Sequence, residues 1–246
     1  MGRSPKGTKP MSGEYYDRVW TEKLSLPQYQ TLDKRWRSRW DYAVERILEG
    51  SRVLDVACGD GVLGEMLIRT KRCDVLGLDV SGYARDAAAK RGVSSLACDI
   101  SQQRFPVDSG AFDVATMLCC LEHVFDPGHA LREAARAVRI DGRLLVTLPN
   151  AVSLRFRWDF LRGRLSKDLL HTNDGEGLHI RFFNYAEDFE RFVAAEAPML
   201  RLTEKIPALK NPRQHRGLGR AVLAAGLRLR PNLFAEYTHY TLVRHT

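Results

Sequence analysis

The sequence predicts an open α/β fold with a mostly parallel sheet and helices on both faces. From residue 51 onward, apolar segments of strand length alternate with segments of helical periodicity, and such alternation requires crossover helices between parallel strands. A glycine-rich turn with Gly59, Gly61 and Gly64 directly follows the first strand segment. Because glycine allows a sharp turn and lets a ligand approach backbone N–H groups, this turn predicts a nucleotide-type ligand site at a helix N-terminus.

Composition divides the chain into three parts. Residues 1–12 are rich in Gly, Pro, Lys and Ser, which predicts a disordered tail, and 13–50 predicts an N-terminal helical cap from its helical spacing of aromatic and aliphatic residues. The α/β domain spans 51–246, and its insertion at 150–180 follows the fifth strand, where a segment is placed to cover the substrate. In order, we expect strands at 51–57, 74–79, 94–98, 112–118, 142–148, 199–206 and 237–244, and helices from 61 and at 82–91, 128–138 and 186–195.

Composition also bounds the class of protein. A chain of 246 residues with 44% hydrophobic content can bury one sizeable core. We find no apolar run near the ~20 residues that cross a bilayer, and the polar start of the chain lacks the apolar centre of a signal peptide. These features predict a cytoplasmic protein.

Cysteine and histidine spacing predicts no metal site. The five cysteines, at 58, 73, 98, 119 and 120, lie in or beside strand segments without a C-x-x-C pair, so we expect them to be reduced core residues. The seven histidines are scattered along the chain, whereas metal ligands ordinarily occur in clusters of defined spacing.

Acidic residues around the glycine turn select among nucleotide-type ligands. Asp55 ends the first strand and Asp60 lies inside the turn, where a dinucleotide would place its pyrophosphate. Two carboxylates repel phosphate but attract a ligand that carries an ammonium and a sulfonium. The charge pattern therefore favours S-adenosylmethionine over a nicotinamide dinucleotide.

The next two strands end in residues suited to the same ligand. Asp79 follows the glycines by roughly 20 residues, the spacing at which an acid reaches ribose hydroxyls. Cys98, Asp99 and Ile100 end the third strand and are suited to hold an adenine between an acid and an apolar side chain. Three successive strand ends are thus expected to converge on one ligand.

The chain resembles the class I S-adenosylmethionine-dependent methyltransferases, which are Rossmann-like and include methyltransferase type 11. DVACGDG at 55–61, GLDV at 77–80, ACDI at 97–100 and FDVATMLCCLEHVFDP at 112–127 carry the resemblance. Residues 144–150, 162–164 and 179–183 are similar to the methionine-biosynthesis-protein-W branch and its sugar- and quinone-modifying relatives. The resemblance implies a seven-stranded sheet of order 3-2-1-4-5-7-6 with an antiparallel hairpin at one edge.

Two features depart from that family pattern. Ala57 stands where many relatives have glycine, and residues 201–246 hold nine Arg and Lys against Glu204 and Glu236, a net charge of +7. This basic segment suits an anionic partner or a solvated surface. Within it, residues 221–227 are apolar almost all round, so we expect that helix to pack against the core, a second subunit or a membrane.

The expected cofactor contacts come from the strand ends and the N-terminal helix. The resemblance implies that Tyr16 and Trp20 fold over the cofactor as a lid, with ordinary packing as the alternative. The expected contacts are Asp55, Ala57, Cys58, Gly59, Gly61, Asp79, Val80, Cys98, Asp99, Ile100, Cys119, Tyr16 and Trp20.

Candidate residues for the methyl acceptor are histidines and arginines. Methyl transfer needs alignment and exclusion of water more than a base, and His123, His171 and His179 are candidates for a base or positioning role. Guanidinium groups suit phosphate or carboxylate, which makes Arg155, Arg162 and Arg181 candidate substrate contacts. Leu154, Trp158, Leu161 and Leu165 form a stripe at helical spacing, which we interpret as packing.

The function expected from these observations is methyl transfer from S-adenosylmethionine, giving S-adenosylhomocysteine, to an oxygen or nitrogen of a small metabolite in a biosynthetic or natural-product pathway. The arginines favour an anionic acceptor. Alternatives are a cofactor-binding regulatory partner without turnover, and a nucleic-acid methyltransferase. The latter is disfavoured because Met117–Leu121 lacks the Asn/Asp-Pro-Pro-aromatic motif of amino-methylating enzymes. The sequence is also compatible with a homodimer.

Overall fold

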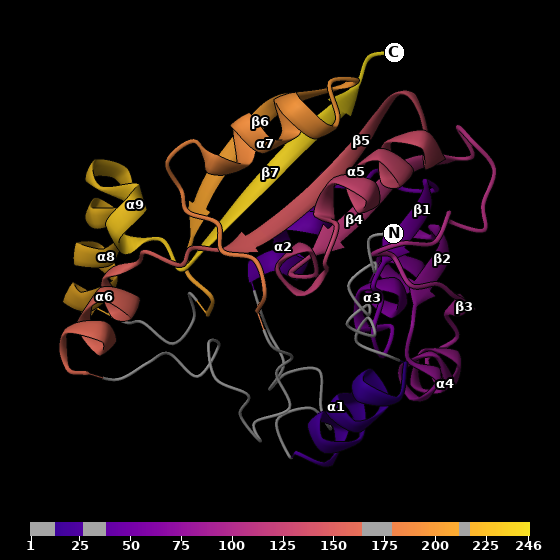
Figure 1. The fold of residues 1–246 in the computed structure, drawn as a ribbon, viewed down its shortest axis with the longest axis horizontal. Coiled ribbons are helices and arrows are strands. Elements are labelled where there is room, and N and C mark those ends of the chain that lie inside the picture. Colours follow the sequence, from indigo (N-terminus) through magenta and orange to yellow (C-terminus); the bar gives the residue numbers. More distant parts are fainter. Residues whose placement is uncertain (1–12, 27–37, 164–178, 212–216) are drawn as a thin grey trace, which may run out of the picture.

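The computed structural model describes residues 13–26, 38–163, 179–211 and 217–246. Its centre is a seven-stranded sheet of order β3-β2-β1-β4-β5-β7-β6, which confirms the expected order (Figure 1). Strands β1 to β5 pair in parallel, and β7 pairs antiparallel with both β5 and β6. The strands are β1 Arg52–Val56, β2 Asp74–Asp79, β3 Ser94–Ala97, β4 Phe112–Leu118, β5 Val138–Pro149, β6 Leu200–Ala208 and β7 Tyr237–Arg244.

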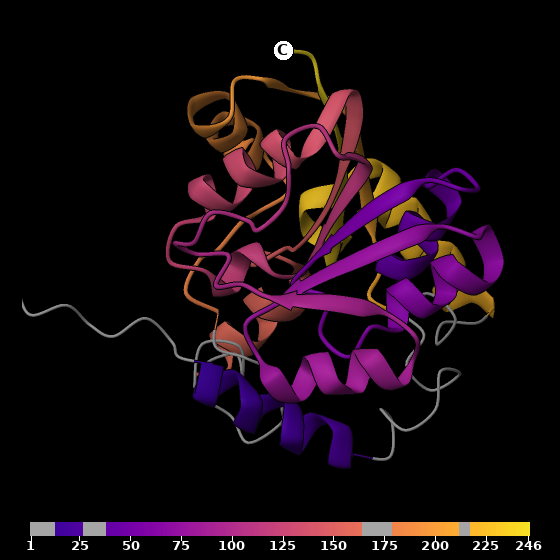
Figure 2. The ribbon, with the colours of Figure 1, turned by 90° about the vertical axis from the view of Figure 1, so that its right-hand side faces the viewer.

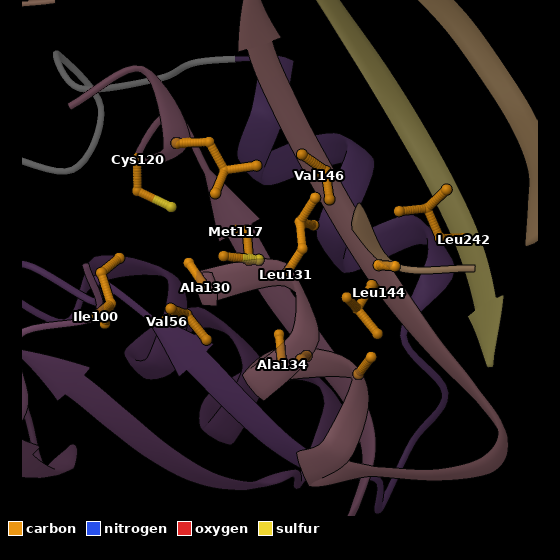
Figure 3. Close-up of a cluster of buried hydrophobic side chains, with 14 of the residues drawn as sticks. Val56, Ile100, Met117, Cys120, Ala130, Leu131, Ala134, Leu144, Val146 and Leu242 are labelled. Carbon is orange, nitrogen blue, oxygen red and sulfur yellow. The ribbon is translucent and has the colours of Figure 1, made fainter. Parts of the chain in front are cut away.

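Helices cover both faces of the sheet. On one face, α5 and α7 enclose a core of buried side chains, and Figure 3 shows Leu131 and Ala134 of α5 beside Met117, Leu144 and Val146 of the sheet. On the other face, α2, α3 and α4 enclose a second core. The helices are α1 Gly13–Ser25, α2 Ser38–Arg46, α3 Val62–Lys71, α4 Gly82–Lys90, the 3-10 turn η3 Leu121–His123, α5 Pro127–Ala137, α6 Leu154–Leu161, α7 Asp188–Glu196, α8 Gly217–Leu229 and α9 Pro231–Phe234.

Local sequence explains where α5 begins and why it lies close to the sheet. The Asp126 side chain accepts a hydrogen bond from the backbone N–H of His129 at 2.8 Å, and Pro127 occupies the first turn. The helix then buries small side chains, Ala130, Ala134 and Ala135 among them, which permit a close approach to β4 and β5. A fixed α5 holds η3, which immediately precedes it, at the end of β4.

The two helices of the N-terminal segment have different surroundings. Helix α2 buries Trp40, Tyr42 and Ala43 in the second core, whereas α1 has no buried residue and lies beside α4. Figure 2 shows α1 running along α4 below the sheet. Residues 1–12, where the sequence predicts a disordered tail, lie outside the described residues.

Two expectations, one about strand length and one about packing, are wrong. Strand β5 begins at Val138, four residues before the expected start, because Val138 still pairs with Phe112 across a register shift. The predicted packing stripe of α6 is exposed at Leu154, Trp158 and Leu161, while Leu165 lies outside the described residues.

Of the three surroundings expected for the helix at 221–227, which are the core, a second subunit or a membrane, the structure does not show packing into the core for α8. Most of its described side chains are exposed, and its buried residue is Gly226, where an added Cβ would lie 2.5 Å from the ring of Phe234 in α9. We find no helix in the described parts of the chain with the length and apolarity needed to cross a membrane.

Candidate functional site

A cavity opens where β1, β2 and β4 end, and α1 closes its outer side. It holds about 860 Å³ of empty space including its open mouth. We call the part of the lining that follows β1, β2 and β3 the strand-end wall, and the part that follows β4 the histidine wall. The strand-end wall comprises Ala57, Asp79, Val80, Cys98, Asp99, Ile100 and Ser101; the histidine wall comprises Cys119, Cys120, His123, Val124 and Phe125; Tyr16, Val19, Trp20 and Lys23 come from α1.

Asp79 lies at the centre of the strand-end wall, where backbone amides hold its carboxylate. Its Oδ2 accepts from the Gly59 N–H at 2.9 Å and its Oδ1 from the Ser81 N–H at 2.9 Å. A carboxylate offers about four lone-pair sites, so both oxygens retain capacity for ligand hydroxyls. Burial raises the pKa of Asp79, and the two N–H donors oppose that rise.

Gly59 and Gly61 of the glycine turn let two helices pack closely against the turn. Neither glycine is among the described residues that line the cavity. Gly59 has φ +56°, and an added Cβ would lie 2.3 Å from the Trp20 ring. Gly61 has φ +76°, and its added Cβ would lie 2.8 Å from the Cβ of Ala88 in α4. Glycine at 59 therefore lets α1 lie directly on the turn, and glycine at 61 lets α4 pack beneath it.

Asp55 and Asp60, expected near the ligand, are not among the described residues that line the cavity. Asp55 is buried, and its Oδ1 accepts from the Thr116 hydroxyl at 2.6 Å. Burial raises the pKa of Asp55 to about 7. The Asp60 carboxylate pairs with Arg91 at 3.3 Å, so its charge is neutralised on the side of α4. The residues that line the cavity include neither acid.

Cys58 also faces away from the cavity. It is buried, and a Cβ added to Gly77 of β2 would lie 2.5 Å from its Sγ. Cys58, Gly59 and Gly61, expected as direct contacts, are thus not among the described residues that line the cavity.

Two lining residues have left-handed backbone conformations although they are not glycine. Ala57 has φ +57° directly after β1, and Cys119 has φ +59° directly after β4. Such conformations cost about 1–3 kcal/mol each and cluster at ligand sites. Ala57, the departure from the family pattern noted in the sequence, therefore occupies a position whose geometry suits glycine.

Helix α1 contributes more to the cavity than the two aromatic residues expected. Tyr16, Val19, Trp20 and Lys23 all line it, and this i, i+3, i+4, i+7 spacing was the signal available in the sequence. Asp17 anchors the helix, because its Oδ1 accepts from the Ser81 hydroxyl at 2.5 Å and from the Tyr83 N–H at 3.0 Å. The Tyr16 hydroxyl donates to the His123 carbonyl at 3.3 Å, which joins α1 to the histidine wall.

The histidine wall brings together residues distant in sequence. His123 lines the cavity, and the ring centroid of His179 lies 4.7 Å from that of His123. The backbone N–H groups of Ile180 and Arg181 donate to the Glu122 carbonyl at 2.8 and 3.1 Å. Glu122 had not been singled out, and local spacing carried no signal for this juxtaposition. His171 lies outside the described residues.

The three candidate arginines are dispersed. Arg155 lies 4.0 Å from the Glu236 carboxylate, and Arg162 stacks on Trp158 with its guanidinium 4.6 Å from the ring centroid. Neither is among the described residues that line the cavity, because α6 leads away from it. Arg181 is the exception, since it donates to the carbonyl of the lining residue Phe125.

Comparison with known proteins places the chain in a family. The family model of methionine biosynthesis protein MetW matches residues 37–242. A ubiquinone biosynthesis O-methyltransferase of Xanthomonas oryzae is 30% identical over 61% of this chain and 68% of that protein. The corresponding enzyme of Aeromonas salmonicida is 34% identical over 42% of this chain and 45% of that protein.

Solved structures agree in fold. A S-adenosylmethionine-dependent methyltransferase from Thermotoga maritima has a TM-score of 0.60 at 19% identity, with 92% of this chain and 98% of that chain covered. The cyclase SpnF has a TM-score of 0.66 at 20% identity, with 99% and 100% covered. From the family match together with the sheet order, the chain belongs to the MetW family and is a class I S-adenosylmethionine-dependent methyltransferase.

Proposed function

We propose that this enzyme binds S-adenosylmethionine against the strand-end wall and methylates an oxygen or nitrogen of a small, anionic metabolite placed against the histidine wall. The observation that carries the proposal is the convergence of Asp79, Asp99 and Ala57, from three separate strand ends, on one cavity. The names of the relatives, O-methyltransferases of ubiquinone biosynthesis, favour oxygen over nitrogen.

The strand-end wall fits the parts of this cofactor in order. The Asp79 carboxylate suits the ribose hydroxyls, because both of its oxygens keep accepting capacity beyond their amide donors. Asp99 and the buried Ile100 suit an adenine through one polar and one apolar contact. Ala57 and Cys119, at the ends of the central strands β1 and β4, leave the methionine portion between them.

The protein side of the reaction is alignment and exclusion of water. S-adenosylmethionine supplies a methyl group already activated by its sulfonium. Trp20, Val80 and Val124 give the cavity apolar surface that excludes water. His123, held through its carbonyl by the Tyr16 hydroxyl, is placed to orient the acceptor atom.

Cations near the cavity favour an anionic acceptor. Lys23 lines the cavity from α1, with its Nζ 4.4 Å from the Trp20 ring centroid, and Arg181 lies behind Phe125. A cation in the lining and a second one bonded to a lining residue suit a carboxylate or phosphate on the acceptor.

The first test is calorimetric titration with S-adenosylmethionine and S-adenosylhomocysteine, with NAD as the control ligand. We expect binding of the first two and none of NAD. The folded protein should then transfer labelled methyl to members of a panel of hydroxylated aromatic and aliphatic acids. Absence of cofactor binding would contradict the proposal, and binding without transfer to any acceptor would support the regulatory alternative.

A matched pair of arginine variants tests the acceptor side. Arg181→Ala should raise the KM for an anionic acceptor by about tenfold, as expected for loss of one charge-assisted contact. Arg162→Ala should leave it unchanged, because Arg162 is stacked on Trp158 away from the cavity. Equal effects of both variants would remove Arg181 from the acceptor site.

A further inference from the structure

Three potential metal ligands meet beside the cavity. One carboxylate oxygen of Glu122 and one ring nitrogen each of His123 and His179 all lie within 4.8 Å of one another. The His123 Nε2 to Glu122 Oε1 distance is 4.0 Å, too long for a hydrogen bond. An ion bound at about 2.0–2.1 Å from each ligand requires ligand separations of roughly 3–4 Å, so small rotations of the two imidazoles would complete the site.

The backbone holds these ligands from two distant parts of the chain. Ile180 and Arg181 donate their N–H groups to the Glu122 carbonyl, and Ala151 donates to the Phe183 carbonyl at 2.9 Å. The Arg181 guanidinium adds a bond to the Phe125 carbonyl. The segment that carries His179 is therefore fixed against η3 and the end of β5, which preorganises the set.

Burial gives the cluster a second property of metal sites. The Glu122 side chain is 1% exposed, and metal sites commonly hold their ion through such buried carboxylates. His123 is 20% exposed and lines the cavity, so one side of the cluster opens toward a bound molecule. A buried anchor with an open coordination side is the arrangement of catalytic rather than structural metal sites.

We propose that Glu122, His123 and His179 bind a divalent first-row transition-metal ion that holds a hydroxyl group of the methyl acceptor. Two imidazoles and one carboxylate suit Zn²⁺, Co²⁺ or Fe²⁺, whereas Mg²⁺ and Ca²⁺ prefer sites made of oxygen ligands. This assignment rests on the proposed function and narrows its acceptor to a hydroxylated molecule.

The ion would act on the acceptor by orientation and acidification. A hydroxyl bound to a divalent ion has a lowered pKa, and its proton leaves to solvent. The oxygen electron pair then forms the bond to the methyl carbon, while the pair of the breaking carbon–sulfur bond stays on sulfur. Charge and atoms balance without an oxidant or a further reactant.

Metal binding is measured directly on full-length protein stripped with a chelator. Titration calorimetry with Zn²⁺ should show one equivalent bound, and Co²⁺ should give the visible absorption of a ligated site, while Mg²⁺ gives no signal. His179→Ala and Glu122→Gln should each weaken Zn²⁺ binding by more than tenfold. His129→Gln is the matched control, because His129 bonds the Gln103 carbonyl on the surface of α5 and should leave binding unchanged.

Cofactor binding separates failure of this site from failure of the proposed function. S-adenosylmethionine affinity should be the same with and without Zn²⁺ and in His179→Ala, because the strand-end wall contains none of the three ligands. Absence of Zn²⁺ binding in protein that binds S-adenosylmethionine would overturn the metal site alone. Zn²⁺ binding that persists unchanged in both ligand variants would also overturn it, since the ion would then lie elsewhere.

Discussion

The two walls of the cavity are built in different ways. In the strand-end wall, the main chain positions the Asp79 carboxylate, because the backbone N–H groups of Gly59 and Ser81 both donate to it. In the histidine wall, a short turn after β4 meets residues 179–181, which are joined to it by hydrogen bonds across 56 or more positions of sequence. The first arrangement suits a ligand of constant shape, and the second leaves side chains that can vary with the acceptor.

The strongest test of this comparison removes the central group of the strand-end wall. Asp79→Ala deletes the acceptor for the Gly59 and Ser81 amides and the proposed ribose contact. Hydrogen bonds to charged groups contribute about 1.5–3 kcal/mol each, so we expect cofactor binding to weaken by at least about 100-fold. Calorimetry with S-adenosylhomocysteine measures the change.

Asp74→Ala is the matched control for that variant. Asp74 begins the same strand but has a side chain 78% exposed, paired loosely with Arg52 at 3.7 Å. Its loss should leave cofactor affinity unchanged. Retained affinity in folded Asp79→Ala would show that the ligand does not use the strand-end wall.

The residues of the strand-end wall could be expected to meet because they follow regular elements. Asp79 ends β2 and Asp99 lies two residues after β3, and the ends of parallel strands meet at one edge of the sheet. The positions of Asp79 and Asp99 in the sequence thus indicated that the two side chains lie at the same cavity. Spacing does not tell which face of a turn a carboxylate takes: Asp55 bonds Thr116, Asp60 pairs with Arg91, and neither acid is among the described lining residues.

Cys119 and His123 of the histidine wall were expected near the ligand, but the docking of residues 179–181 on that wall was not predicted, because it depends on long-range contacts. Nothing local links His179 to Glu122, and the contact arises only when residues 179–181 dock on η3. Helix α6 shows the same limit, since its apolar spacing suggested packing although Trp158 is 52% exposed. Lys23 was accessible to prediction through its helical spacing from Tyr16, because one face of α1 lines the cavity.

A second prediction concerns the acid buried behind the strand-end wall. Asp55 has a pKa raised from 3.8 to about 7 by burial, with the nearby Asp79 charge also raising it and the Thr116 hydroxyl lowering it. The unfolded chain ionises this group more readily, so its contribution to stability is fully present below pH ~4 and is lost as the pH rises through 7. We expect a loss of about 3–4 kcal/mol between pH 4 and pH 8 from this group.

Asp55→Asn keeps the oxygen that accepts from Thr116 but cannot ionise. Urea unfolding of the variant and of the natural protein should therefore give a stability difference that shifts in favour of the variant as the pH rises. His239, whose pKa burial lowers to about 3, has the opposite pH dependence but is present in both proteins and cancels in the difference. A difference independent of pH would show that Asp55 does not carry a raised pKa.

The smallest predicted effect is a change in stability at Ala57, the residue of the strand-end wall that directly follows the central strand β1. Ala57→Gly relieves a left-handed conformation that costs the folded state about 1–2 kcal/mol. The greater freedom of glycine in the unfolded chain lowers the free energy of unfolding by about 0.4–1 kcal/mol, which offsets part of this stabilisation. We expect a net stabilisation of about 0.5–1 kcal/mol by urea unfolding. Ala135→Gly, within α5, is the control and should destabilise by about 1 kcal/mol. If Ala57→Gly destabilised as much as the control, the turn after β1 would not hold Ala57 in the strained conformation, and the strand-end wall would owe its shape to side chains, as the histidine wall does.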